Sequence, residues 1–181
     1  KQVAEEGTQN ILDAIPKKCK IIFPSTHVVY EGVKEIKKNI LEDEELSPVL
    51  TYSNSKATNE NQIKKSGKKF VILRLGSVYG YSTDTARIDI MPNLFSKITS
   101  QDGTLKLFAG GRQLKSLVPL IDVARCFKNM EEKDDIKLET FNLTKDSVTV
   151  KDVANICKKY NPKVILKETN DEVPNLGFSL S

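Results

Sequence analysis

The chain has 181 residues, with 28 lysines and arginines against 24 aspartates and glutamates, which gives a formal net charge of +4. Hydrophobic residues make up 39% and charged residues 29% of the sequence, as in ordinary globular proteins. No apolar run approaches the roughly 20 residues that a membrane-spanning helix needs. A single histidine and three scattered cysteines argue against a metal site and a disulfide framework, and they favour a reducing, cytoplasmic setting. The lysine pairs are not interleaved with aromatic residues, which argues against a nucleic-acid partner.

Helices and buried strands alternate over the first part of the chain. Residues 3–15 carry an apolar stripe at helical spacing, and residues 19–23 form a short apolar run typical of a strand buried on both faces. Residues 30–50 are polar and irregular. Residues 52–67 are expected to form a helix, and residues 69–75 a second buried strand. This alternation predicts an α/β fold with a parallel sheet.

Shorter elements follow. Thr149 and Asp152 form a capping box that predicts the start of a helix. The expected elements are, in order, a loop at 76–89, a helix at 90–99, strands at 105–108 and 116–120 around Gly110-Gly111, a helix from a cap at Asp122 to residue 130, a strand at 141–143, a helix ending at residue 160, a strand at 164–166 and an unstructured tail.

A hydroxyl, a phenol and an ammonium group are expected to meet at one edge of the sheet. Thr26 follows the first strand at its carboxyl end, where parallel α/β sheets bind ligands. Tyr52 and Lys56 are four residues apart, so they share one face of the predicted helix. Lowering the pKa of a phenol by about 3 units needs roughly 4 kcal/mol of preferential stabilisation of the phenolate. A nearby ammonium supplies part of it, so the pattern predicts Tyr52 as a general base and Thr26 as a partner of the substrate oxygen.

A second Tyr-x-x-x-Lys pattern, at Tyr30 and Lys34, shows how weak this spacing is by itself. Tyr30 stands just after the first strand and beside Gly32, where a continuous helix is not expected. Tyr52 follows Pro48 at the start of a long helical stretch, so we favour Tyr52.

Several ordered motifs resemble those of the extended short-chain dehydrogenase/reductase family, and more narrowly its nucleotide-sugar epimerases and dehydratases. The resemblance covers nearly the whole chain. The motifs are Pro-Ser-Thr-His-Val-Val-Tyr at 24–30, Pro48-x-x-x-Tyr52-x-x-Ser55-Lys56-x-x-x-Glu60, Leu73-Arg74-Leu75-Gly76-Ser77-Val78-Tyr79-Gly80, Gly7-Thr8-x-Asn10, Met91-Pro92-Asn93, and Gly110-Gly111-Arg112-Gln113-Leu114-Lys115-Ser116 followed by Asp122-Val123-Ala124.

The resemblance implies the C-terminal part of a Rossmann-type parallel sheet plus a small α+β substrate-binding lobe. Residues 1–75, with about 116–145, would form a partial NAD-binding domain. Residues 76–115 and 146–181 would form the substrate-binding lobe.

The resemblance also implies roles for individual residues. Lys115 stands at a common phosphate-binding arginine position, where lysine keeps the charge and loses the bidentate geometry. The implied sites are Thr26, Tyr52 and Lys56 for catalysis, Tyr52, Lys56, Leu75 and Gly76 for the cofactor, and Thr26, Ser77, Asn93 and Lys115 for the substrate.

The resemblance further implies NAD as cofactor, a nucleotide-diphosphate sugar as substrate, and a homodimer formed through the helices at 1–15 and 52–67. NADP stays an alternative to NAD. The similar 4,6-dehydratases carry Asp-Glu after the catalytic threonine, whereas His27 and Val28 follow Thr26 here. We therefore expect an epimerase that oxidises the sugar to a keto-sugar and reduces it again. A dehydratase, reductase or decarboxylase of the same family, or a non-catalytic binding module, stays open as a second hypothesis.

The Gly-rich phosphate loop of such enzymes is not present. None of the 9 glycines belongs to a G-x-x-G-x-x-G or G-x-G-x-x-G pattern, and the sequence opens directly in a helical segment. We therefore expect a truncated chain that by itself neither binds NAD tightly nor turns over substrate.

Several candidate residues also have a purely structural interpretation. Glu60 is expected to pair with Lys56 or Lys64 on the helix surface. In structural terms alone, Thr26 would cap a turn, Lys56 would be a solvated helix lysine, His27 a loop residue, Asn93 a helix N-terminal residue, Lys115 a surface charge and Gly110-Gly111 a turn.

Overall fold

The computed structural model describes residues 2–83, 87–171, 173 and 177–181. Within these residues, no helix is both long enough and apolar enough to cross a membrane.

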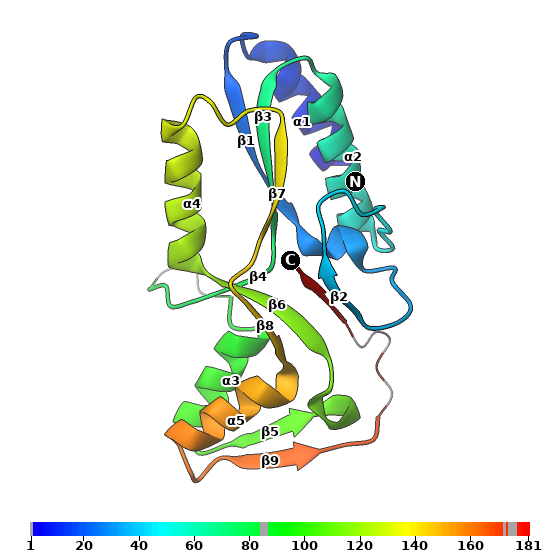
Figure 1. Ribbon diagram of the computed structural model, residues 1–181. Helices are drawn as coiled ribbons and strands as arrows, with labels where there is room; N and C mark the ends of the chain where they lie inside the picture. Colours follow the sequence, from blue (N-terminus) through cyan, green and yellow to red (C-terminus); the bar gives the residue numbers. More distant parts are fainter. Residues whose placement is uncertain (1, 84–86, 172, 174–176) are drawn as a thin grey trace.

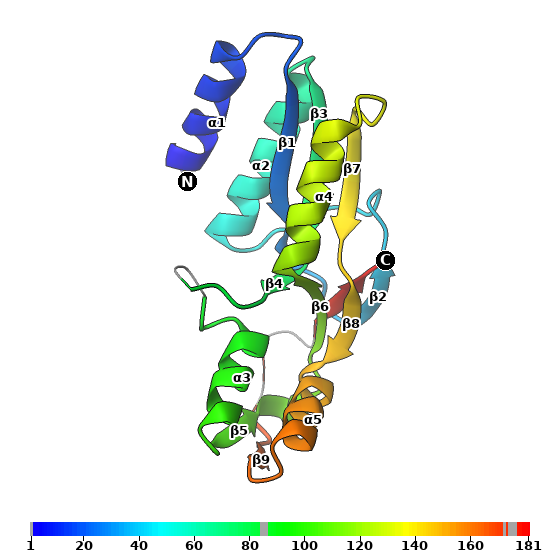
Figure 2. The same cartoon turned by 90° about the vertical axis from the view of Figure 1, so that its left-hand side faces the viewer.

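A three-stranded parallel sheet forms one end of the molecule (Figure 1). Its strands lie in the order β1-β3-β7, and Thr26 at the end of β1 pairs with Leu75 at the end of β3. Helices α1 and α2 cover one face of the sheet and α4 covers the other (Figure 2). The elements are α1 (Gln2–Ala14), β1 (Lys20–Thr26), α2 (Thr51–Lys65), β3 (Lys69–Leu75), α4 (Leu120–Glu132) and β7 (Glu139–Leu143).

The central strand of this sheet behaves as the sequence predicts, and the first strand does not. Phe70, Val71, Ile72 and Leu73 of β3 are buried. Strand β1 was predicted to be buried on both faces, and that was wrong, because Lys20–Phe23 are only half-buried. Among the described residues β1 pairs with β3 alone, so it forms the edge of this sheet.

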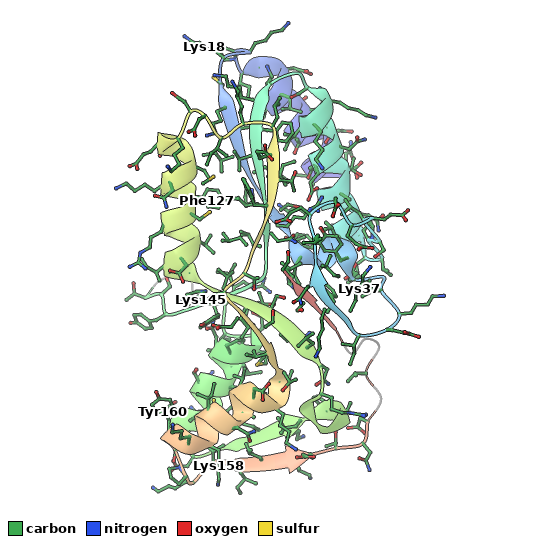
Figure 3. The ribbon with its side chains drawn as sticks, in the orientation of Figure 1. Lys18, Lys37, Phe127, Lys145, Lys158 and Tyr160 are labelled. Carbon is green, nitrogen blue, oxygen red and sulfur yellow. The ribbon has the colours of Figure 1, made fainter. Side chains whose placement is uncertain are left out.

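The opposite end of the molecule is a smaller α/β layer with its own apolar core. Two parallel strands pack against two helices around Phe95, Leu105 and Leu107. Helix α5 begins at the predicted capping box of Thr149 and Asp152 and ends at Tyr160, whose side chain lies on the outside (Figure 3). The elements are α3 (Met91–Ser100), β5 (Thr104–Leu107), the 3₁₀ helix η2 (Phe108–Gly111), α5 (Val150–Tyr160) and β9 (Ile165–Glu168).

Short strands join the two ends. Strand β6 pairs in parallel with β4 and antiparallel with β8, and β2 pairs in parallel with β10. The bounds are η1 (His27–Tyr30), β2 (Lys37–Ile40), β4 (Ser77–Tyr79), β6 (Leu114–Pro119), β8 (Asp146–Thr149) and β10 (Phe178–Leu180).

Three expectations about these segments were wrong. The irregular stretch 30–50 contains β2, the loop 76–89 contains β4, and the tail contains β10. Phe178 and Leu180 are buried with Val29, Tyr30 and Ile40, which explains why the tail is ordered there. The tail positions 172 and 174–176 lie outside the described residues.

The predicted helix cap at Asp122 was also wrong. The N-cap of helix α4 is Pro119, three residues earlier, and the helix begins at Leu120. Asp122 lies in the first turn and pairs with Arg125 at 3.2 Å and Lys145 at 3.5 Å.

Candidate active site

A cavity of about 470 Å³ opens at the carboxyl ends of β1 and β3. It brings together most of the predicted site residues, which come from β1, α2, β3, β4 and β6 and from Gly76. Its walls are Ser25, Thr26, His27, Val28, Glu31, Leu50, Tyr52, Leu75, Gly76, Ser77, Val78, Arg87, Ile90 and Lys115.

Thr26 occupies its predicted site position and also caps a turn. Its side chain is buried at the end of β1 and lines the cavity. Its hydroxyl accepts a hydrogen bond from the Val28 N–H at 3.4 Å and so caps η1.

Tyr52 lies in the first turn of α2, with 57% of its surface exposed. Lys56, one turn later, donates from Nζ to the Pro24 carbonyl oxygen at 2.8 Å. The same Nζ lies 4.6 Å from the centre of the Phe23 ring and 5.9 Å from that of Tyr52. Burial lowers the pKa of Lys56, and the nearby Glu60 carboxylate opposes this. The solvated-lysine interpretation of Lys56 is therefore wrong, because these contacts hold its ammonium group beside Tyr52.

Lys56 faces a second cavity, of about 330 Å³, that shares Tyr52 with the first. The remaining walls of this cavity come from α1, Phe23 and the α2 residues Ser55 and Asn59. Tyr52 therefore lies between the 470 Å³ cavity and the 330 Å³ cavity.

Glu60 was expected on the surface of the helix, and that was wrong. The predicted pairing with Lys64 is present at 3.8 Å, but the Glu60 side chain is only 1% exposed. Its main partner is Arg74 of β3, with Nη2 2.8 Å from Oε2, and Ser25 donates to Oε1 at 2.5 Å. Both residues stand in the family motifs, but no spacing rule connects them, because they belong to different elements.

Tyr30, the tyrosine of the second Tyr-x-x-x-Lys pattern, is fully buried at the end of η1. Its hydroxyl donates to the Leu41 carbonyl oxygen at 3.2 Å and accepts a hydrogen bond from Arg74. Burial raises the pKa of this phenol, although Arg74 opposes the shift. Tyr30 is therefore a structural residue, as its position beside Gly32 suggested.

His27 has a more specific role than that of a loop residue. Its Nδ1 lies 2.9 Å from the Leu75 carbonyl oxygen, which can only accept, so Nδ1 carries the proton. Burial lowers the pKa of His27 to about 4, and the ring packs at 5.6 Å from that of Phe178. A neutral His27 thus ties η1 to the end of β3.

Gly76 follows β3 where two neighbouring strands approach it closely. Its N–H donates to the Leu143 carbonyl oxygen at 2.9 Å. A Cβ at this position would come within 2.8 Å of the Ser116 carbonyl oxygen. Leu75, Gly76 and Ser77 therefore form a fixed wall of the cavity.

Lys115 of β6 lines the 470 Å³ cavity and also a more apolar cavity of about 650 Å³ in the α3/α5 end of the molecule. Burial lowers the pKa of its ammonium group. Lys115 is half-buried, and its binding of a phosphate stays a prediction. The walls of the larger cavity include Met91, Leu94, Phe95, Phe108 and Gln113.

Like Lys56, Asn93 is a predicted site residue that does not line the 470 Å³ cavity. Its Oδ1 accepts from the Gly80 N–H at 3.1 Å and its Nδ2 donates to the Arg87 carbonyl oxygen at 2.9 Å. It lines a separate cavity of about 210 Å³. Its amide holds the segment after β4, and a contact with the substrate stays a prediction.

Glu31 also lines the 470 Å³ cavity and was not predicted as a site residue from the sequence. No motif marks it, because its partners include backbone groups at residues 49 and 50. In the part of the chain that the structure describes, no group of three or more His, Cys, Asp or Glu side chains is placed to hold a metal ion.

A family model described as the NAD dependent epimerase/dehydratase family matches residues 2–144. The chain belongs to this family. Its α/β fold with a Rossmann-type parallel sheet is also that of solved nucleotide-sugar epimerases. No curated protein sequence matches the chain significantly.

Solved structures of nucleotide-sugar epimerases superpose on nearly the whole chain. UDP-glucuronic acid 4-epimerase from Bacillus cereus, in complex with UDP-glucuronic acid and NAD, is 23% identical, with a TM-score of 0.81 over 98% of this chain and 58% of that one. A mutant of that enzyme with UDP-4-deoxy-4-fluoro-glucuronic acid and NAD is 25% identical, with a TM-score of 0.83 and the same coverage, 98% and 58%. UDP-glucose 4-epimerase from Thermotoga maritima, with UDP-glucose, is 20% identical, with a TM-score of 0.80 over 99% and 60%. The chain thus spans less than two thirds of the length of each of these structures.

Proposed function

We propose that the protein carrying this chain is an NAD-dependent nucleotide-sugar epimerase in which Tyr52 is the general base. One observation carries this proposal: the 470 Å³ cavity gathers Thr26, Tyr52 and Lys115 at the carboxyl ends of parallel strands, with Lys56 one helical turn from Tyr52. Membership of the family supports the cofactor and the reaction class.

The two cavities that share Lys115 fit the two ends of a nucleotide-diphosphate sugar. The larger, mostly apolar cavity, with Phe95 and Phe108 among its walls, suits a flat base and its ribose. The smaller cavity, with Thr26 and Tyr52, suits the sugar. Lys115 lies between them, where a diphosphate would bind, and its half-buried ammonium is the matching charge.

The residues around the 330 Å³ cavity fit the nicotinamide and ribose of NAD. Tyr52 and Lys56 supply hydroxyl and ammonium groups, and Phe23 and Ile11 supply apolar walls. When bound, NAD supplies a hydride acceptor and returns the hydride. Tyr52 removes the proton from a sugar hydroxyl and gives it back, and Lys56 favours the phenolate. Thr26 holds the oxygen of the reacting carbon, beside the wall that Leu75 and Gly76 form.

Epimerisation accounts for the cavity better than 4,6-elimination, which needs a proton donor beside Thr26. His27 uses its Nδ1 proton for the Leu75 carbonyl oxygen. Burial raises the pKa of Glu31, but hydrogen bonds from Ser53, Leu50 and Val49 outweigh it and leave the pKa lowered. Glu31 is therefore ionised at neutral pH and is not such a donor.

Three further features belong to the same proposal. Residues 1–75 with about 116–145 serve as part of the NAD-binding domain, and 76–115 with 146–181 serve as the substrate-binding lobe. The protein is a cytoplasmic homodimer in which α1 and α2, which pack together through Asn59 and Gln62, form the contact. Light scattering of the intact protein tests the dimer.

The test of the function is incubation of the intact protein with NAD and a panel of nucleotide sugars, followed by product analysis by NMR. We expect one substrate to be converted to its epimer without net formation of NADH. Net NADH formation or release of carbon dioxide would instead assign a dehydrogenase or decarboxylase. No turnover of any nucleotide sugar, with NAD or NADP, would contradict the proposal.

A further inference from the structure

The helix that carries Tyr52 begins without a cap of its own. Leu50 is the N-cap residue of α2 and has no polar side-chain atoms, although helix N-termini leave several N–H groups to be satisfied. In a capping box, a carboxylate three residues into the helix would accept from the N-cap N–H. In α2 that third residue is Ser53, which is fully buried and has no carboxylate.

Glu31 supplies the missing carboxylate from another segment. Its Oε1 accepts hydrogen bonds from the Leu50 N–H at 2.7 Å and the Val49 N–H at 3.0 Å. The Ser53 hydroxyl donates to the same oxygen. Three donors that flank Tyr52 in sequence therefore converge on one oxygen atom. Because Glu31 is ionised, these are charge-assisted hydrogen bonds at the positive end of the helix dipole.

Glu31 is itself joined to Thr26 through a single turn. Thr26 is the N-cap of η1 and Glu31 is its C-cap, whose N–H donates to the Val28 carbonyl oxygen at 3.1 Å. The Thr26 hydroxyl accepts from the Val28 N–H, so both caps act on Val28. Thr26, η1, Glu31 and the first turn of α2 thus form one continuous hydrogen-bonded connection around the cavity.

We propose that Glu31 is a positioning residue that fixes the Tyr52 turn of α2 relative to Thr26. This inference rests on the proposed function for its catalytic consequence. Glu31 needs no contact with the substrate, because its Oε1 acts through the backbone on the N-terminal side of Tyr52 and through Ser53 on the other. A general base must lie within hydrogen-bond reach of its proton, so a shift of the Tyr52 turn lowers kcat more than it raises KM.

The test compares Glu31→Ala, which removes the acceptor, with Glu31→Gln, which keeps an acceptor oxygen without the charge. Glu35→Ala is the matched control, because Glu35 is an exposed glutamate four residues away. In the intact protein we expect Glu31→Ala to lower kcat about 10- to 100-fold with a smaller change in KM. We expect Glu31→Gln to recover at least half of the loss in kcat on a logarithmic scale. We expect Glu35→Ala to have the same kcat and KM as the unmodified protein.

Hydrogen exchange of the amides of residues 49–53 tests the positioning without an activity assay. Glu31→Ala is expected to speed their exchange about fivefold, as for loss of a helix cap, and Glu31→Gln much less. If the unmodified protein turns over no nucleotide sugar, the proposed function fails, and exchange alone decides the role of Glu31.

The inference is overturned if Glu31→Ala folds and changes neither exchange nor kcat, or if Glu31→Gln loses as much as Glu31→Ala. If Glu31→Ala does not fold, Ser53→Ala replaces it, since this variant removes one of the three donors. Ser53→Ala should then speed exchange and lower kcat to a smaller extent, and no change in either would overturn the inference.

Discussion

Both ends of the molecule have a buried apolar cluster, and among the described residues only the end around β1, β3 and α2 adds a buried ion pair. Around β1, β3 and α2, the buried side chains include a charged pair, Arg74 and Glu60, with Ser25 and Tyr30 bonded to it. Around α3 and α5, the buried cluster is wholly apolar and consists of Phe95, Leu105, Leu107, Ala154, Cys157 and Val164.

This difference matches what each end has to do under the proposed function. Hydrogen bonds and ion pairs are directional, so they fix one arrangement of β1, β3 and α2, and with it the positions of Thr26, Tyr52 and Lys56. Apolar packing is stabilising but less directional. It suffices for α3 and α5, which only have to provide the wall of a cavity.

Breaking the buried ion pair should have the largest effect on stability. Arg74→Met leaves the Glu60 carboxylate buried without its main partner, so the free energy of unfolding should fall by about 3–5 kcal/mol. The double variant Arg74→Met/Glu60→Leu should recover much of this loss, because it removes both charges. Urea unfolding of the three proteins measures this, and a single variant that costs less than about 1 kcal/mol would show that the pair is not structural.

Truncation of the apolar core at the α3/α5 end should have a similar or slightly smaller effect. Leu107 is fully buried, so Leu107→Ala should lower the free energy of unfolding by about 2–5 kcal/mol. Ile165→Ala is the control, because Ile165 is 58% exposed. Hydrogen exchange in α2 should be unchanged in folded Leu107→Ala protein, and faster exchange there would contradict the separation of the two ends.

Acid should destabilise the β1–β3 end through His27. Burial lowers the pKa of His27 from 6.5 to about 4, so the unfolded chain binds a proton in this range before the folded one does. The contribution of His27 to the free energy of unfolding is therefore fully present above pH 6.5. It falls as the pH drops towards about 4, by about 3 kcal/mol at most. The difference between the pH–stability curves of the unmodified protein and His27→Asn isolates this contribution. A difference curve that is flat over this range would contradict it.

The smallest of these effects is expected at the capping box of α5. Thr149 accepts from the Asp152 N–H at 3.1 Å, and Asp152 accepts in return from the Thr149 N–H at 2.8 Å. Thr149→Ala should lower the free energy of unfolding by about 1 kcal/mol, which is measured as a lower melting temperature. Ser147→Ala, at an exposed position of the preceding strand, should have no measurable effect. Equal melting temperatures for the two variants would show that the box contributes little.

Local patterns in the sequence predicted the elements that are stabilised locally. The helix at 52–67, the strand at 69–75 and the capping box of α5 each depend on residues within a few positions of one another, and all three are present. The pairing of β10 with β2 could not be predicted, since about 140 residues separate the two strands. No spacing rule connects segments so far apart.

In the candidate site, too, local relations could be predicted from the sequence and contacts between distant segments could not. The i,i+4 relation of Tyr52 and Lys56 could be read from the sequence because a helix defines it. Glu60 was placed on the surface by the same rule, but its main partner Arg74 comes from the neighbouring strand. Glu31 was missed because its partners include backbone N–H groups, which carry no sequence signature.

The central claim is that Tyr52 is the general base, and replacing its hydroxyl tests this most directly. In the intact protein, with NAD and the nucleotide sugar found to react, Tyr52→Phe should lower kcat about 10²- to 10⁴-fold while the protein stays folded. Tyr160→Phe, at the exposed end of α5, should keep full activity (Figure 3). If Tyr52→Phe keeps most of its turnover, Tyr52 is not the base, and this assignment of the site is wrong.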